Sequence, residues 1–322
     1  MTHVSDDPLS IRLSRWIGSW ASVIAPASMV SALLFYFGYV SSRAQYAYFG
    51  VDVDTIGLGT QDYIMRSPQP LLVPLLVLTL LGSGLLTANN ILRKRAVIAV
   101  GQAAGARTRR IRRLVRLAIV IGLFELAVGV VLLFLYAAVR NWAGYDLVTP
   151  LLITTGGALV AYSSHFSSFL ERIEEGRVAA GEAEPRPVES SFVNDPVPPR
   201  RMVQILLYIL VAASTLWATA TIAQWSGRGL AQDTARHLDS LPRVILDTKE
   251  RLFLRSPDVE ETVLPAADGQ TFRYRYRNLR LLIVGRDRMF LVPEKWSASN
   301  STLVVPFGDS TRVQFQFQSQ PP

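Results

Sequence analysis

The chain contains no cysteine, so disulfide bonds, thiolate metal sites and cysteine nucleophiles are all excluded. It has only three histidines, and their wide separation excludes a histidine-rich metal site within one short motif: His3, His165 and His237. It also lacks a Walker loop, an H-E-x-x-H helix, a Gly-x-Ser-x-Gly elbow and a dinucleotide fingerprint after a strand. We therefore expect no cofactor, no metal site and no catalytic residue, and we do not expect an enzyme.

Acidic residues are missing from the most basic part of the chain. The stretch 93–116 holds nine basic residues and no Asp or Glu, which exceeds the net charge of +8 of all 322 residues. The positive charge is therefore local and not a general property of the protein. No aromatic residue alternates with the arginines of 107–116 to stack on bases, so nucleic acid is not an expected partner.

Long apolar segments are what this sequence has in quantity, since half of its residues are hydrophobic. A bilayer crossing needs about 20 apolar residues. Five segments meet this requirement: 16–40, 70–92, 117–139, 147–169 and 203–225. The first could be a signal peptide, but its apolar stretch exceeds the usual 7–15 residues or so and no clear cleavage site follows. We predict a helical membrane bundle of five transmembrane helices, residues 1–225, with a linker at 170–202.

The arginine run lies directly before the third apolar segment, where it predicts the orientation of the chain. Cytoplasmic loops are enriched in Lys and Arg. With the N-terminus inside, the cytoplasmic segments carry 16 basic residues and the two outer loops carry 3. Each basic residue near anionic head groups contributes about 1 kcal/mol. Six arginines are therefore expected to set orientation and contact lipid head groups: Arg107, Arg109, Arg110, Arg112, Arg113 and Arg116.

One carboxylate lies well inside a predicted span. Glu125 is about 3 residues, or roughly 5 Å, from the middle of the third segment. Ionisable residues at such depth are costly and often functional. Glu125 is a candidate for an ion or proton pathway, and the alternative is a hydrogen-bonded residue that ties helices together. Small residues in the spans, such as Gly122 and Gly156, suit close helix packing, either within one chain or in a homo-oligomer.

The outer loop 41–69 contains aromatic residues suited to the membrane interface. Asp52, Asp54 and Gly57 match the first, third and sixth positions of a calcium-binding loop, but Ile56 and Tyr63 occupy two positions where oxygen ligands are needed. The preferred interpretation is a turn-rich loop capped by its aspartates.

Residues 226–322 have strand-like patterns in place of long apolar runs. In 272–277, aromatic residues alternate with three arginines, Arg273, Arg275 and Arg277, which predicts a strand with one buried and one polar face. Val313, Phe315 and Phe317 alternate in the same way with glutamines. We predict a small antiparallel β-rich C-terminal domain of about five to seven strands, a sandwich or an open barrel. The three arginines form a candidate anion-binding stripe, and the alternative is a solvated face paired with Glu260, Glu261 and Asp268.

Three stretches, "YFGVD…TQDYIMRS", "YRYRNLRLLIVGRDRMFLVPEKW" and "LVVPFGDSTRVQF", resemble an uncharacterised group of bacterial multi-pass membrane proteins. The resemblance implies a plasma-membrane setting but no activity and no residue roles. We expect a bacterial plasma-membrane protein with a cytoplasmic N-terminus and an extracytoplasmic domain at 226–322, whose partners are membrane lipids and another membrane protein or a second copy. The preferred function is a non-catalytic binding module. The alternatives are a small oligomeric transporter or channel with Glu125 in its pathway, and a membrane sensor.

Overall fold

A computed structural model describes residues 8–101, 105–139, 141–179, 200–254, 256–266, 269–297 and 299–316. The chain divides into two compact units, one made of residues 1–72 with 223–322 and the other of residues 73–222. The predicted boundary at residue 225, which separates membrane from extracytoplasmic residues, stays a prediction.

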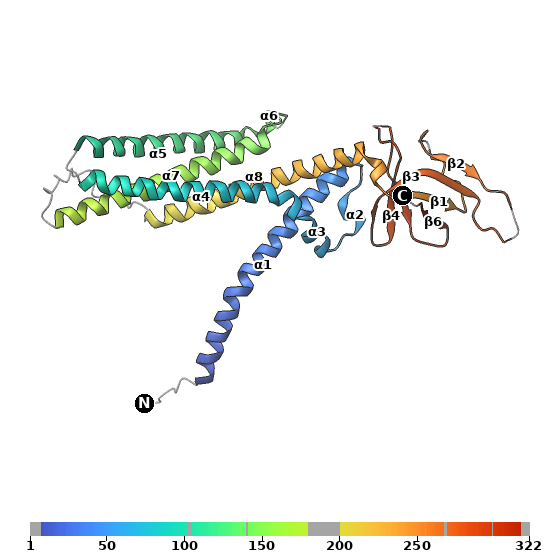
Figure 1. Cartoon of the computed structure of the whole chain (residues 1–322), viewed down its shortest axis with the longest axis horizontal. Coiled ribbons are helices and arrows are strands. Elements are labelled where there is room, and N and C mark those ends of the chain that lie inside the picture. Colours follow the sequence, from blue (N-terminus) through green and yellow to red (C-terminus); the bar gives the residue numbers. More distant parts are fainter. Residues whose placement is uncertain are drawn as a thin grey trace, which may run out of the picture. The chain divides into compact units, whose positions relative to one another are not determined.

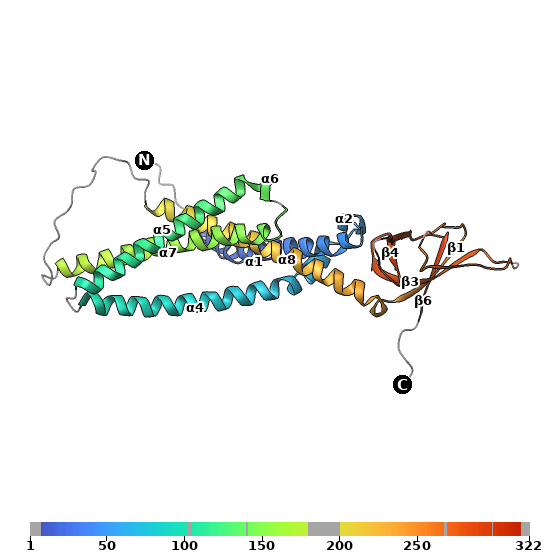
Figure 2. The ribbon, with the colours of Figure 1, turned by 90° about the horizontal axis from the view of Figure 1, so that it is seen from above.

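The second unit is helical. It contains most of α4 (Pro68–Gly101), then α5 (Gly105–Phe134), α6 (Tyr136–Val139), α7 (Tyr145–Ala179) and the first part of α8 (Arg200–Arg236). Helices α5 and α7 lie side by side (Figures 1 and 2). Glycines allow this contact, because a Cβ on Gly122 would come within 2.9 Å of the carbonyl oxygen of Gly156. The expectation that small residues serve close packing therefore holds for this pair, whereas Gly82 and Gly84 face open space.

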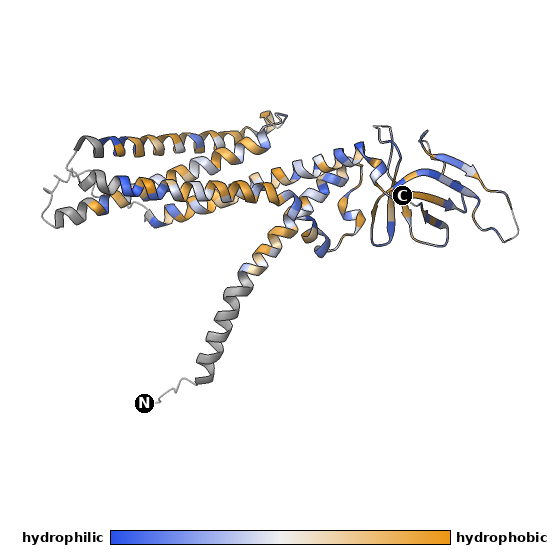
Figure 3. Cartoon of the chain, in the orientation of Figure 1, coloured by the Kyte–Doolittle hydropathy of each residue, from blue (hydrophilic) through white to orange (hydrophobic). Residues whose placement is uncertain are grey.

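Four helices in the described part of the chain are long and apolar enough to cross a membrane, and most of each apolar window is not buried within the protein. The candidate spans are Pro68–Arg95, Arg109–Phe134, Tyr145–Ile173 and Arg201–Arg236. In the first two, only 11% of the most apolar window is buried within the protein. Figure 3 shows the resulting apolar faces in orange. Apolar surfaces that extend along whole helices need lipid or another apolar partner, which argues against a water-soluble bundle.

The expected count of five spans is not confirmed. The first predicted segment, 16–40, lies within α1 (Pro8–Tyr48), a helix of 41 residues. Its side chains are described from Pro26 onward, so those of residues 16–25 lie outside the described residues. The other four predicted segments overlap the four candidate spans.

The first unit joins the end of α1 to α2 (Val53–Ile56), α3 (Thr60–Arg66), the end of α8 and the C-terminal sheet. Glycine again sets the closest approach, because a Cβ on Gly38 of α1 would overlap the backbone carbonyl of Tyr63 in α3. The ring of Tyr63 packs edge-on against Phe35 and Tyr39, with centroids 5.4 Å apart in both pairs. The predicted outer loop 41–69 is therefore largely helical and packed.

Six strands form one antiparallel sheet in the described part of the C-terminal region. Their order is β5-β4-β3-β1-β6, and β2 pairs with the first part of β3. The strands are β1 (Arg243–Thr248), β2 (Glu260–Val263), β3 (Tyr274–Val284), β4 (Arg288–Pro293), β5 (Leu303–Pro306) and β6 (Thr311–Phe315). The expected antiparallel sheet is present, and its six described strands lie within the expected five to seven. Of the two expected forms, a sandwich or an open barrel, the sandwich is wrong, because all six strands belong to a single sheet.

The sheet is covered on both faces, which explains how one sheet can have a core. On one face Leu246, Tyr276 and Leu291 pack beneath Leu252, Leu254 and Val259 of the β1–β2 connection. On the other face Phe290 packs against Val53 and Ile56, and Val292 packs against Phe49 and Leu238. Strand β4 is therefore buried on both sides, in agreement with its continuous apolar run "MFLVP".

A bulge in β3 determines which side chains face which way. Asn278 has a φ of 62°, and one extra β3 residue lies opposite the step from Val244 to Leu246 of β1. The extra residue shifts the alternation, so that Tyr276 and Leu279 lie in the same core. Arg275 and Arg277 therefore share a face with Arg280, on the side opposite Tyr276.

Candidate anion-binding face of the sheet

The predicted alternation is present from Tyr274 to Arg277, whereas Phe272 precedes β3 and its ring lies against the guanidinium group of Arg312. Tyr276 is fully buried, whereas Arg273 and Arg277 are exposed and Arg275 is half-buried. The hydroxyl oxygen of Tyr276 accepts a hydrogen bond from the Leu252 amide at 2.7 Å, which fixes the covering loop. Burial raises the pKa of this phenol, and the neighbouring Glu261 carboxylate acts in the same direction. The tyrosine face is therefore core, and the arginine face is available for polar contacts.

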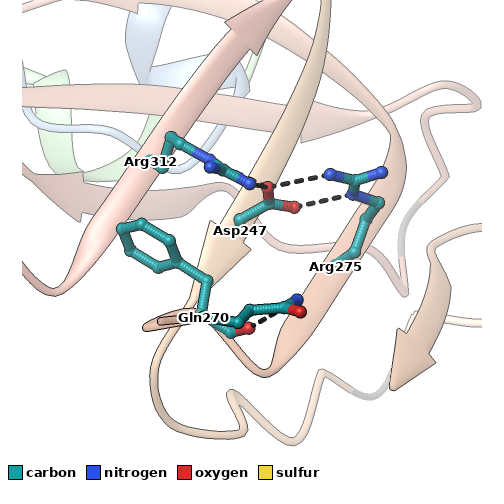
Figure 4. A network of polar contacts seen from close by, with 5 residues as sticks. Asp247, Gln270, Arg275 and Arg312 are labelled. Carbon is teal, nitrogen blue, oxygen red and sulfur yellow. Dashed lines mark hydrogen bonds and ion pairs between the residues drawn. The ribbon is translucent and has the colours of Figure 1, made fainter. Parts of the chain in front are cut away.

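Asp247 of β1 lies in the middle of the arginine face and contacts two of its arginines (Figure 4). Its Oδ1 accepts a hydrogen bond from Arg275 Nε at 2.8 Å, and its Oδ2 accepts one from Arg312 Nη2 at 2.6 Å. The three residues are direct cross-strand neighbours on β3, β1 and β6. Asp247 is fully buried, so two cations enclose one anion.

Two opposing effects act on this carboxylate. Burial alone raises the pKa of Asp247, but the hydrogen bonds and charges of Arg275 and Arg312 outweigh it and bring the pKa below its ordinary value of 3.8. Asp247 is therefore ionised at neutral pH. The row Arg275–Asp247–Arg312 has a net charge of +1.

Sequence reasoning missed Asp247 and Arg312. A signal for Asp247 was present, since it is a lone acid within the apolar strand "VILDT", and buried acids are normally paired. Glu260, Glu261 and Asp268 were the expected partners of the arginine stripe. Glu261 instead accepts a hydrogen bond from Arg251 at 2.6 Å, and Glu260 lies opposite Arg277 in the β2–β3 register. Asp268 lies outside the described residues.

Arg273 and Arg277 differ from Arg275 in their surroundings. Both side chains are exposed, and neither makes an ion pair or hydrogen bond with the described residues. They lie two residues before and two residues after Arg275. Four residues of extended chain separate their Cα atoms by about 13 Å. The face therefore offers two accessible guanidinium groups around a centre in which Asp247 balances one of its two arginines.

A second arginine cluster on this face is structural. Arg280 is buried and donates to Glu294 at 2.5 Å and to the carbonyl oxygen of Leu241 at 3.0 Å. Arg243 donates to the same Glu294 oxygen at 2.6 Å. Burial raises the pKa of Glu294, but Arg243 and Arg280 outweigh it and lower the pKa overall. The cluster fixes the segment between α8 and β1 to the sheet. Both arginines are paired with Glu294.

Glu125 lies at the contact between α5 and α7. A Cβ added to Gly156 would lie 3.0 Å from the Cβ of Glu125, so the glycine makes room for the glutamate side chain. The oxygen Oε2 is buried and has no hydrogen-bond partner among the described residues. Elsewhere in this unit Thr154 donates a hydrogen bond to Ser214 at 2.8 Å, whereas the buried Oγ1 of Thr149 also has no partner among the described residues.

The arginines expected to contact lipid lie at the start of α5. Arg109, Arg110, Arg113 and Arg116 are exposed and Arg112 is half-buried, whereas the side chain of Arg107 lies outside the described residues. Between them, Ile111 and Val115 pack against Phe166 and Leu170 of α7. This part of α5 is therefore amphipathic, and the orientation that its arginines predict stays a prediction.

The aspartates of the outer segment act as helix caps. The amide of Asp54 donates to Asp52 Oδ1 at 3.3 Å, and the amide of Gly59 donates to Asp62 Oδ2 at 2.8 Å. Gly57 ends α2 with a φ of 75°. These contacts agree with the expected turn-rich segment capped by its aspartates.

Comparison of the chain with protein-family models, curated proteins and solved structures gives no match. Its function is therefore argued from its own residues.

Proposed function

We propose that this is a membrane protein whose C-terminal sheet is a non-catalytic binding domain for phosphate- or carboxylate-bearing ligands outside the membrane. The observation that carries the proposal is the pair of exposed arginines, Arg273 and Arg277, which have no side-chain partner among the described residues and lie on either side of the Asp247-bound Arg275. Guanidinium groups bind phosphate and carboxylate through paired N–H donors. Because Asp247 holds Arg275 in place, the strand between the two free arginines is rigid.

The spacing of the two arginines favours a ligand with several anionic groups. The Cα atoms of Arg273 and Arg277 are about 13 Å apart, so their side chains can contact separate charges of one polymer or of a lipid surface. Arg312 adds a partly accessible third guanidinium, whose carbon lies 4.9 Å from the ring centroid of Phe272. The absence of known catalytic motifs in the sequence supports binding without chemistry.

The test uses the full chain, because removing residues 1–225 would uncover Phe290 and Val292 on the sheet. The protein is placed in nanodiscs of neutral lipid, and fluorescent polyphosphate is titrated. We expect Arg273→Ser/Arg277→Ser to lose most of the affinity. A control with the same charge change, Arg236→Ser/Arg286→Ser, alters two exposed arginines elsewhere in the same unit and should bind normally. Equal loss in both variants would make binding a matter of net charge and remove the proposal.

A second candidate, an ion or solute pathway through the helical unit, is favoured by one observation. Glu125 has a buried carboxylate oxygen without a partner among the described residues, and such a costly arrangement within a span is often functional. The binding proposal is preferred because a pathway needs more than one polar position, and the sequence has no second acid or base at the depth of Glu125.

A further inference from the structure

A groove between α1 and α8 in the first unit has the chemistry of a binding site. It has a volume of about 610 Å³. Its walls are seven residues of α1 and two of α8: Tyr36, Tyr39, Val40, Arg43, Ala44, Ala47, Tyr48, Gln224 and Arg228. The α1 residues recur three or four positions apart and so share one face of the helix, as do Gln224 and Arg228. Two helix faces thus meet around one space.

Close contact of the two helices creates the groove. A Cβ on Gly227 would overlap the backbone carbonyl of Ser41, so α8 lies directly on α1 at this point. Ser41 and Ser42 are buried there, whereas the next residue of α1, Arg43, is exposed. On α8, Arg228 follows Gly227 and is also exposed. The helices touch along one line, and the groove opens beside it.

The groove is positively charged and contains no acid in its lining. Arg43 and Arg228 make no ion pair or hydrogen bond with any described residue. The hydroxyl of Tyr39 donates to Asp54 at 3.1 Å, which keeps that carboxylate outside the lining and occupied. Two guanidinium groups facing the same space without a counter-ion would attract one anion.

The remaining α1 lining is aromatic or apolar, and it lies on both sides of Arg43: Tyr36, Tyr39 and Val40 precede it, and Ala44, Ala47 and Tyr48 follow it. Tyr36 is 47% exposed and Tyr48 is 41% exposed, although both are large aromatic residues. Val40 and Ala44 complete this wall. Tyrosine rings are favoured at the membrane interface, where one side is apolar and the other is wet. The groove therefore has a cationic part with apolar walls on both sides, and the wall before Arg43 belongs to the predicted span 16–40.

The position along both helices matches the edge of a membrane. Arg43 lies three residues past the end of the predicted span 16–40, and Arg228 lies three residues past the end of the predicted span 203–225. The contact of Ser41 with Gly227 brings these two span ends to the same level. Arginine side chains at such positions reach the head groups, while the preceding residues remain at the depth of the acyl chains.

We infer that this groove binds one anionic phospholipid, with the phosphate between Arg43 and Arg228 and an acyl chain along Tyr36 and Val40. The inference rests on the membrane placement in the proposed function but not on ligand binding by the sheet. Free phosphate would use only the two arginines, and a neutral phospholipid such as phosphatidylcholine would bring the positive charge of its own head group close to them.

The experiment is native mass spectrometry of the full chain, purified in detergent and titrated with phosphatidylglycerol or phosphatidylcholine. We expect one phosphatidylglycerol to be retained, and Arg43→Gln/Arg228→Gln to weaken its retention about 30-fold, the effect of removing two basic residues at a membrane surface. The charge-matched Arg236→Gln/Arg286→Gln control should bind as the wild type does. Arg273→Ser/Arg277→Ser should also retain the lipid, which separates this site from the sheet face.

Three outcomes would overturn the inference. Equal retention by the wild type and by Arg43→Gln/Arg228→Gln would place the lipid elsewhere. Equal retention of phosphatidylcholine would show that charge does not matter. Displacement of the lipid by an equal concentration of inorganic phosphate would make the groove a phosphate site. Arg43→Lys/Arg228→Lys keeps the charges and should keep measurable binding, which guards against loss of fold in the glutamine variant.

Discussion

Gly227 of α8 and Ser41 of α1 are in backbone contact, so that a Cβ at position 227 would overlap the carbonyl of Ser41. The residues are 186 positions apart in the sequence, and each follows closely on the end of a predicted membrane span. The contact thus joins the beginning and the end of the predicted membrane region within one compact unit, the unit that also contains the sheet.

The first prediction concerns this contact. Gly227→Ala should lower the free energy of unfolding by about 1–3 kcal/mol, the usual cost of inserting a group into a packed site, even though alanine favours helix by about 1 kcal/mol. Gly229→Ala is the matched control, since a Cβ there meets nothing within 4 Å. Thermal unfolding in detergent should show a lower melting temperature for position 227 and an unchanged or higher one for 229. Similar shifts at both positions would mean that the helices separate at little cost.

A second prediction concerns the attachment of residues 49–66 to the sheet. The Arg286 amide donates to the carbonyl of Ile56 at 3.2 Å, and a Cβ on Gly285 would overlap that same carbonyl. Gly285→Ala should therefore push α2 off the β3–β4 turn and increase hydrogen exchange of the amides at 51–57. Gly308→Ala alters a turn glycine with open space around it and should leave exchange unchanged. Unchanged exchange in Gly285→Ala would show that the turn can shift without releasing α2.

Residues 49–66 also show what could not be predicted from the sequence. The alternation in 272–277 is local, so it correctly predicted which face of β3 is buried. The docking of Val53 and Ile56 on Ile283 and Phe290 joins residues more than 200 positions apart, and no local pattern encodes it. Composition indicated an interfacial loop, because aspartates and glycines mark turns. The structure uses these same residues to cap short helices whose apolar sides complete the core of the sheet.

The side-chain pairs between neighbouring strands of the sheet also could not be predicted from the sequence. The arginine stripe was visible, but Asp247 lies opposite Arg275 only because of the β1–β3 register, which depends on the bulge at Asn278. Membrane segments were easier to predict, since length and apolarity suffice for them. Four of the five predicted segments coincide with candidate spans for this reason.

The third prediction is a pH dependence caused by Asp247. Its pKa is below 3.8 in the folded protein, so the unfolded chain takes up a proton first as the pH falls. The stabilisation by this carboxylate should therefore be complete well above pH 3.8 and should disappear as the pH falls through the lower folded pKa. Asp247→Asn should cost about 2–3 kcal/mol at pH 7, somewhat less than the 3–5 of a fully buried pair, because Arg312 remains partly hydrated.

Urea unfolding of the sheet, followed by near-ultraviolet circular dichroism from pH 7 to pH 3, checks this third prediction. The difference between wild type and Asp247→Asn should shrink toward the acid end. Asp309→Asn removes an exposed carboxylate from the β5–β6 turn and serves as the control. A difference that is constant with pH would assign the effect of Asp247→Asn to packing rather than charge.

The last prediction addresses Glu125 and decides between its two interpretations. A buried carboxylate oxygen without a partner is a cost, so Glu125→Leu should leave stability unchanged or raise it by about 1–2 kcal/mol. If Glu125 instead ties α5 to α7 by a hydrogen bond, the leucine variant should be less stable. Glu125→Gln, which keeps the shape and removes the charge, is then compared with the wild type for proton and cation flux in liposomes. A binding protein should give no flux above empty liposomes in either form, whereas flux that disappears in Glu125→Gln would favour the pathway over the binding domain as the main function.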